Sequence, residues 1–428
     1  MCAPLGVRLS YFRRFIELHG GRQAFAGKTS AQVCFEYVVP YTKSSGLSLV
    51  DHVRLRTTDA ESVQPATWYI SHAWSYVFLE TLDSLESFFA GGPEPVVWFC
   101  VFNNNQHEAA SYPFEWWQTT FQSSLAAIGN VVMIMHPWKN PATLTRSWCI
   151  FEVYVAITVG ATFDVALASN QEDQFLDDMV EDISAFHSML ATVSSERAQA
   201  TVPSDKINID SVIKAEVGFL GLDRLVFDTI KTWMLARLEQ RVELAASLVE
   251  KAKYMKALAE FQGLLTHFTV AESLANEALQ LYLESYGPLH ADTLFVQGLV
   301  AVFRGFQYKP REDWEPVLLN VIDNLTTVVG PDHELTLNCM MQLGNLYVDI
   351  LGMPDEALTL LGETLRRMRN VFGADHERTI ACQMAYTLTE AGQDEYDVAV
   401  SKVTACITDV TRALGPHHPT SLAGPALE

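Results

Sequence analysis

The chain has 428 residues, of which 49% are hydrophobic and 19% charged, so disorder throughout the chain is excluded. The formal net charge is −22, and residues 231–428 carry half of it, so the acidity is spread over the whole chain. Such acidity argues against binding nucleic acid or an anionic membrane through a basic face. At about 100–200 residues per domain, the length predicts two or three domains.

The seven cysteines are scattered and form no C-x-x-C pair. This spacing argues against a disulfide framework and a cysteine-rich zinc module, and it fits a reducing compartment. The first residues, MCAPLGVRLSYFRRFIEL, lack the long apolar core of a secretory signal peptide. We therefore expect a cytoplasmic protein.

Residues 1–65 precede the first clear strand and carry no recognisable motif. We expect them to form an N-terminal extension that packs on the following domain. RRFIEL at 13–18 favours a short helix, and VRLR at 53–56 favours a strand.

From residue 66 the chain alternates between apolar stretches that favour buried strands and amphipathic stretches that favour helices. We expect strands at 66–74, 95–102, 130–138 and 161–168, and helices at 75–90, 114–129 and 145–160. Alternation of this kind, with strands that are apolar along nearly their whole length, indicates a parallel sheet covered on both faces. The sequence predicts an α/β domain over residues 66–235.

The carboxyl ends of the expected strands are polar and aromatic. Ligands of open parallel sheets bind beyond these ends, so the residues there are candidates for a site. They are Ser71, His72 and Trp74 after the first strand, His107 after the second, His136 and Trp138 after the third, and Arg146, Trp148, Cys149 and Glu152 around the start of the next helix.

The sequence Ile70-Ser71-His72 at the end of the first strand and Ser147-Trp148-Cys149-Ile150-Phe151-Glu152 on the third helix resemble a TIR domain. The resemblance covers roughly residues 66–170 and extends to about 235 with a divergent fifth strand. It implies a flavodoxin-like sheet and, where such domains cleave NAD, a catalytic glutamate at Glu152. The dinucleotide would contact the loop from Ser71 to Ser75.

NAD cleavage builds oxocarbenium character, which a nearby carboxylate such as Glu152 can stabilise. We expect an NAD site to use Ser71, His72 and His107, the tryptophans Trp74, Trp138 and Trp148 for stacking, and Arg146 for phosphate.

Other roles fit the same residues. Glu152 could be a buried carboxylate that holds the first strand's loop, and Trp148 and Cys149 could belong to the core. His72, His107 and His136 could bind zinc if the first strand lies between the second and third. Cys149 could pair with a histidine as a nucleophile, because a helix N-terminus lowers the pKa of a thiol.

The second half contains an internal repeat. Gly287-Pro-Leu-His290, Gly330-Pro-Asp-His333, Gly373-Ala-Asp-His376 and Gly415-Pro-His-His418 recur every 42 or 43 residues. In this motif the glycine ends one helix, and the first three copies have a threonine three residues after the histidine, where the next helix opens. Histidines one repeat apart are expected to cap or pack on their own hairpins rather than to bind metal.

Small residues recur between these turns, including Ala301 and Gly344 eleven residues after a histidine and Ala271 and Ala357 nineteen residues before one. They let antiparallel helices approach closely, which predicts an all-α solenoid of about four helical hairpins over residues 245–428.

The period and turn motif resemble the tetratricopeptide repeats of kinesin light chains, best at LGNLY (343–347) and ALTLLGETL (357–365). The second repeat departs most, at Arg304 and Trp314. The resemblance implies that a protein or peptide partner binds in the repeat groove. Because the repeat half is acidic, the preference of kinesin light chains for acidic peptides is not expected.

Two hypotheses follow. In the first, the protein is a cytosolic signalling or scaffold protein that needs no cofactor, and its TIR-like module can form homo-oligomers. In the second, that module cleaves NAD and the repeats control its assembly.

Overall fold

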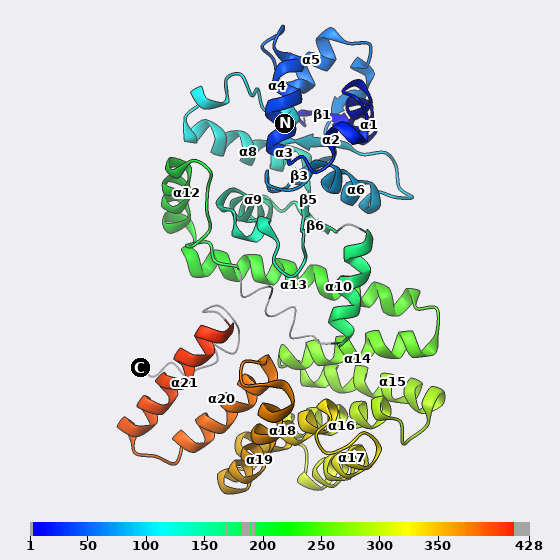
Figure 1. Ribbon diagram of the computed structural model, residues 1–428, viewed down its shortest axis with the longest axis vertical. Helices are drawn as coiled ribbons and strands as arrows, with labels where there is room; N and C mark the ends of the chain where they lie inside the picture. The colour runs from blue at the N-terminus through cyan, green and yellow to red at the C-terminus, as the bar shows by residue number, and fades with distance from the viewer. Residues whose placement is uncertain (1–2, 168, 182–188, 190–192, 415–428) are drawn as a thin grey trace. The chain divides into compact units, whose positions relative to one another are not determined.

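The computed structural model describes residues 3–167, 169–181, 189 and 193–414 (Figure 1). The chain divides into two compact units. The first holds residues 1–176 and 192–233, and the second holds residues 177–191 and 234–428. The first unit is built around a mixed sheet, and the described part of the second is helical, as predicted for an α/β fold joined to an all-α array.

The sheet of the first unit has six strands in the order β2-β1-β4-β3-β5-β6. Strands β4, β3, β5 and β6 are parallel, while β1 runs antiparallel to both β2 and β4. The strands are β1 Leu5–Arg8, β2 Val63–Pro65, β3 Trp68–Ser71, β4 Val96–Phe99, β5 Asn130–Ile134 and β6 Thr162–Ala166. Each of the four predicted strands is found, shorter than its apolar stretch.

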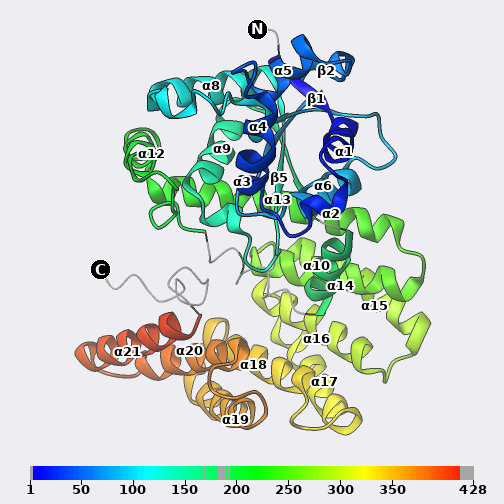
Figure 2. The same ribbon diagram turned by 45° about the horizontal axis from the view of Figure 1, so that its top comes forward.

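Helices cover both faces of this sheet, because its central strands are apolar on both sides. Figure 2 shows α1 and α6 on one face and α8 and α9 on the other. The described helices of the unit are α1 Leu9–Leu18, α2 Arg22–Phe25, α3 Ser30–Val33, α4 Val39–Thr42, α5 Leu49–Arg56, α6 Phe78–Phe88, α7 Cys100–Asn103, α8 Phe114–Ile128, α9 Ser147–Thr158, α10 Ser169–Glu181, α12 Pro203–Glu216 and α13 Phe219–Leu244. Helices α10 and α13 both continue into the second unit.

The N-terminal residues contribute to the sheet and to its core. Strand β1 passes so close to β4 that a Cβ on Gly6 would lie 2.4 Å from the Val97 carbonyl oxygen, which explains a glycine at this position. Phe12 of α1 stacks on Phe78 of α6 and packs edge-on against Phe99 of β4. Residues 1–65 therefore share one hydrophobic core with the predicted α/β domain.

The strand predicted at VRLR is wrong, because residues 53–56 end helix α5. The Ser48 side chain accepts a hydrogen bond from the Asp51 backbone and caps this helix, a signal that the prediction missed. Leu49, Val50 and Val53 are buried at helical spacing. The fifth strand implied by the TIR resemblance is also not found among the described residues after β6, which form α10, α12 and α13 and an isolated bridge between Gln199 and Arg146.

The second unit stacks four helical hairpins within its described residues (Figure 1). The pairs are α14 Leu248–Leu264 with α15 Phe268–Tyr286, α16 Ala291–Phe306 with α17 Glu315–Val328, α18 Glu334–Asp349 with α19 Pro354–Phe372, and α20 Glu377–Ala391 with α21 Tyr396–Leu414. The predicted small residues lie inside this stack: Ala271, Ala301 and Ala357 are at most 1% exposed.

Candidate functional site

Glu152 on helix α9 is hydrogen-bonded to the end of strand β3. The Tyr69 hydroxyl donates to Glu152 Oε1 at 2.8 Å, and the Ser71 hydroxyl donates to Oε2 at 2.6 Å. Tyr69 and Ser71 both reach α9 because residues two apart on a strand point to the same face of the sheet. The two hydrogen bonds tie the strand end to the helix.

The Glu152 carboxyl group is buried, with the residue only 8% exposed. Burial raises its pKa to about 7, although the hydrogen bonds from Ser71 and Tyr69 favour the ionised form and oppose the shift. Burial and the neighbouring Glu152 also raise the pKa of Tyr69 well above its usual value, so its hydroxyl stays protonated and remains a donor.

The side chains of His72 and Trp74, which follow Ser71 in the chain, contact residues of β4 and α7. The His72 ring stacks on Phe99 with the ring centres 4.3 Å apart, and burial lowers its pKa to about 3. The Trp74 indole donates to Cys100 Sγ at 3.1 Å. Among the predicted site residues, the Ser71 side chain is hydrogen-bonded to Glu152, and it also interacts with the Cys149 thiol.

The remaining predicted site residues contact three separate parts of the first unit. The Trp148 indole donates to Asp205 at 3.0 Å, and the Arg146 guanidinium donates to the Thr201 hydroxyl at 2.7 Å. His107 is hydrogen-bonded to the Thr42 hydroxyl at 2.8 Å, while Trp138 is buried against Phe175. Each of these side chains joins two elements of the fold.

The three histidines considered for a zinc site and the cysteine considered as a nucleophile lie in different surroundings. His136 lies 3.2 Å from a Glu80 carboxylate oxygen, whereas His72 is buried against Phe99 and His107 bonds to Thr42. Among the described residues, no group of three or more histidine, cysteine or carboxylate side chains could hold a metal ion. Burial also raises the pKa of Cys149 well above its usual value, which opposes a nucleophilic thiolate.

The second unit has two distinct helix layers. The first helices of neighbouring hairpins, α14, α16, α18 and α20, contact one another directly, whereas the second helices α15, α17, α19 and α21 are not closely in contact with one another along the described array. Closer packing on one side curves a solenoid toward that side, so the first helices line its concave face.

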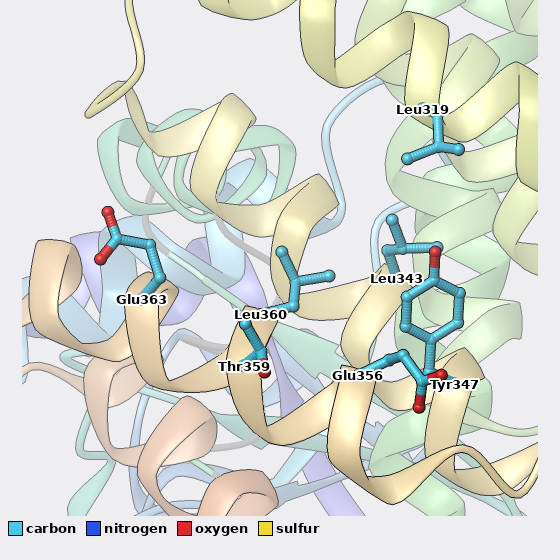
Figure 3. Close-up of a pocket in the computed structure, with 7 residues that line it drawn as sticks. All are labelled: Leu319, Leu343, Tyr347, Glu356, Thr359, Leu360 and Glu363. Atoms are coloured by element: carbon cyan, nitrogen blue, oxygen red, sulfur yellow. The ribbon is translucent and has the colours of Figure 1, made fainter.

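A hollow of about 420 Å³ opens between the second helices α17 and α19, with α18 between them. Figure 3 shows Leu319 from α17 above Leu343 and Tyr347 from α18, with residues of α19 along the other side. The lining from α19 consists of Glu356, Thr359, Leu360 and Glu363. Most of the lining surface is apolar, so the hollow is suited to an apolar group.

Residues 336–378 match a model of the tetratricopeptide repeat. The match spans α18, α19 and the start of α20, and so includes most of the residues that line the hollow. A search of curated proteins found no match to the chain. The tetratricopeptide repeat supports a role as a protein-interaction scaffold.

The turn histidines of the tetratricopeptide repeats act as helix caps, as predicted. The backbone N–H groups of Asp292, Leu335 and Arg378 donate to the Nδ1 atoms of His290, His333 and His376 at 3.2 to 3.3 Å. Tyr286 and Phe372 stack on the first and third of these rings. His418 lies outside the described residues.

The departures of the second repeat also have structural causes. Arg304 donates to the buried Glu272 at 2.9 Å, and the Lys309 ammonium lies 2.5 Å from the same carboxylate group. Trp314 is fully buried in the core of the array, where it occupies the place of a small residue in the other repeats.

Several partners of the candidate residues were not predicted from the sequence. Tyr69 could have been found, because it lies two residues before Ser71 on the same strand face. Asp205, Thr201 and Thr42 carry no local signal for their contacts, since they come from segments more than 50 residues away in the chain. In the hollow, five of the lining residues belong to the two stretches that the sequence singled out, 343–347 and 357–365: Leu343, Tyr347, Thr359, Leu360 and Glu363.

Proposed function

We propose that this protein is a cytoplasmic scaffold whose tetratricopeptide repeats bind a protein partner on the concave face formed by α14, α16, α18 and α20. The observation that carries the proposal is the stack of four hairpins with its first helices packed together on one side. Asn338 and Asn345 lie on the side of α18 opposite Leu343 and Tyr347, because each helical residue advances by about 100°. Both asparagines are partly exposed and offer amide groups to a partner's backbone.

For the first unit we propose a TIR-like module that signals or assembles, including through homo-oligomers. Its parallel strands, numbered along the chain, have the order 2-1-3-4, which is the order of the first four strands of a flavodoxin-like sheet. The W-C-x-x-E sequence starts at the first turn of α9, where Glu152 reaches back to β3.

NAD cleavage by the same module is a second proposal, and the raised pKa of Glu152 favours it, since shifted carboxyl groups cluster at functional sites. Catalysis would need NAD to reach this carboxylate. Its burial and its two hydrogen bonds give it a clear structural role, so we favour the scaffold function.

One experiment tests the scaffold function, and a second tests NAD cleavage. Partners captured by the tagged full chain are compared with those captured by a chain lacking residues 245–428; partners lost on deletion support the repeats as the binding surface, and retention of every partner contradicts it. Separately, the full chain is incubated with NAD at high protein concentration, with Glu152→Gln as the control. Nicotinamide release by the full chain that is lost in Glu152→Gln would support catalysis. No nicotinamide release by the full chain would exclude NAD cleavage.

A further inference from the structure

The hollow between α17 and α19 lies on the other side of α18 from the proposed concave binding face. It exists because the second helices of neighbouring hairpins are not packed closely together, while α18 fills the space beneath them. Leu319 is 43% exposed at its edge, although Leu343 on its floor is buried. A volume of about 420 Å³ fits a large side chain and its adjoining backbone.

One wall of the hollow is held in place by ionic contacts. The Arg311 guanidinium donates two hydrogen bonds, of 2.5 and 2.6 Å, to the Glu315 carboxylate, and the Tyr347 hydroxyl is hydrogen-bonded to the same carboxylate. A fixed aromatic ring loses little conformational entropy when a partner binds against it. Tyr347 is therefore a preformed contact surface.

The described residues that line the hollow include two carboxylates, Glu356 and Glu363, and neither lysine nor arginine; Figure 3 shows the carboxylates at opposite ends of its α19 side. Glu363 is paired with Arg366 and Arg367. Glu356 is exposed, and no ion pair or hydrogen bond is found for it among the described residues, although Arg311 is near enough to interact electrostatically.

We propose that the hollow is a docking site for a protein segment that inserts one large apolar side chain between α17 and α19 and places a lysine or arginine beside Glu356. The apolar lining selects the inserted side chain, and the Glu356 carboxylate selects the basic neighbour. The inference rests on the proposed scaffold function and adds a second surface to it, with a partner chemistry opposite to the acidic peptides of kinesin light chains.

The test is a selection of random 12-residue peptides, displayed on phage, against the full-length protein. The selected peptides should combine a large apolar residue with lysine or arginine. Synthetic versions should bind Leu319→Ser and Glu356→Lys at least about fivefold more weakly than the unchanged protein. They should also shift the methyl NMR signals of Leu319, Leu343 and Leu360.

Matched controls separate the hollow from general effects on fold and charge. Val328→Ser removes an exposed apolar side chain from α17, the helix that carries Leu319. Glu284→Lys makes the charge change of Glu356→Lys at an exposed position on α15. Both control variants should bind the peptides as the unchanged protein does. Acidic consensus peptides, or peptides that bind the two hollow variants normally, would overturn the proposal, as would the absence of any selected peptide. Peptides lost only in Asn338→Arg/Asn345→Arg would overturn it while leaving the scaffold function intact.

Discussion

Arg304 of α16 donates a hydrogen bond of 2.9 Å to Glu272 of α15, a carboxylate whose side chain is only 12% exposed. Lys309 and Gln307 bind the same carboxylate group. Burial alone would raise the pKa of Glu272, but hydrogen bonds from these three side chains outweigh it and lower the pKa to about 2. An ionic contact thus joins the most divergent repeat, at α16, to α15 of the preceding hairpin.

We expect Glu272→Gln to destabilise the repeat unit by about 1–3 kcal/mol at neutral pH, because Arg304 and Lys309 lose their counter-charge. The folded-state pKa is depressed, so the unfolded chain binds more protons and the stabilisation is lost as the pH falls from 4.5 toward 2. Urea unfolding at several pH values measures this. If the difference in free energy of unfolding between Glu272→Gln and the unchanged protein did not shrink as the pH falls from 4.5 toward 2, the account would be contradicted.

Glu152 should give the opposite pH dependence. Its pKa is raised from 4.5 to about 7, so the folded protein binds more protons and its free energy of unfolding falls as the pH rises through this range. We expect the free energy of unfolding to fall by about 2–3 kcal/mol as the pH rises across this range, and we expect no such fall in Glu152→Gln. Thermal unfolding of the first unit from pH 4.5 to 8 measures it, with the exposed Glu115→Gln as control. Equal pH slopes in the Glu152 and Glu115 variants would refute this assignment.

The close approach of α18 and α19 depends on Gly344. A Cβ at this position would lie 2.7 Å from two carbon atoms of Leu361. We expect Gly344→Ala to cost about 1–3 kcal/mol through overpacking. Gly392→Ala is the matched control, because its Cβ would meet nothing nearer than 3.5 Å. Chemical denaturation of both variants decides the point, and equal stability would show that the helices can move apart without cost.

The histidine caps can be tested at His333, which accepts a hydrogen bond from the Leu335 backbone at the start of α18. His333→Ala should destabilise the array by about 1 kcal/mol, whereas His333→Asn should retain most of the stability because asparagine caps helices well. The midpoint of urea unfolding reports the difference. If the two substitutions were equally destabilising, the histidine ring would be stabilising the turn by some means other than capping.

The pattern of apolar residues was sufficient to predict the four parallel strands of the first unit and the helical hairpins of the second. Strands β3, β4 and β5 are buried on both faces and their apolar runs are continuous, while the glycine, histidine and small-residue positions define the hairpins. Helix α5 was missed because the alternation Val53-Arg54-Leu55-Arg56 at its end is typical of a strand, and because its start depends on the Ser48 cap.

The side-chain partners were harder to predict. Tyr69 and Glu152 are 83 residues apart, and Arg304 and Glu272 are 32 apart, so no local pattern marks either pair. The hollow between α17 and α19 depends on the spacing between successive hairpins, and a sequence repeat specifies which residues face one another but not how far the second helices separate.

The central claim is that the concave face of the repeats binds a protein partner. The most direct measurement is the affinity of a captured partner for the full-length protein and for Asn338→Arg/Asn345→Arg, with Glu284→Lys on α15 as the control and circular dichroism to confirm folding. We predict at least about tenfold weaker binding to the folded double variant and unchanged binding to the control. Equal affinity for all three proteins would contradict the claim.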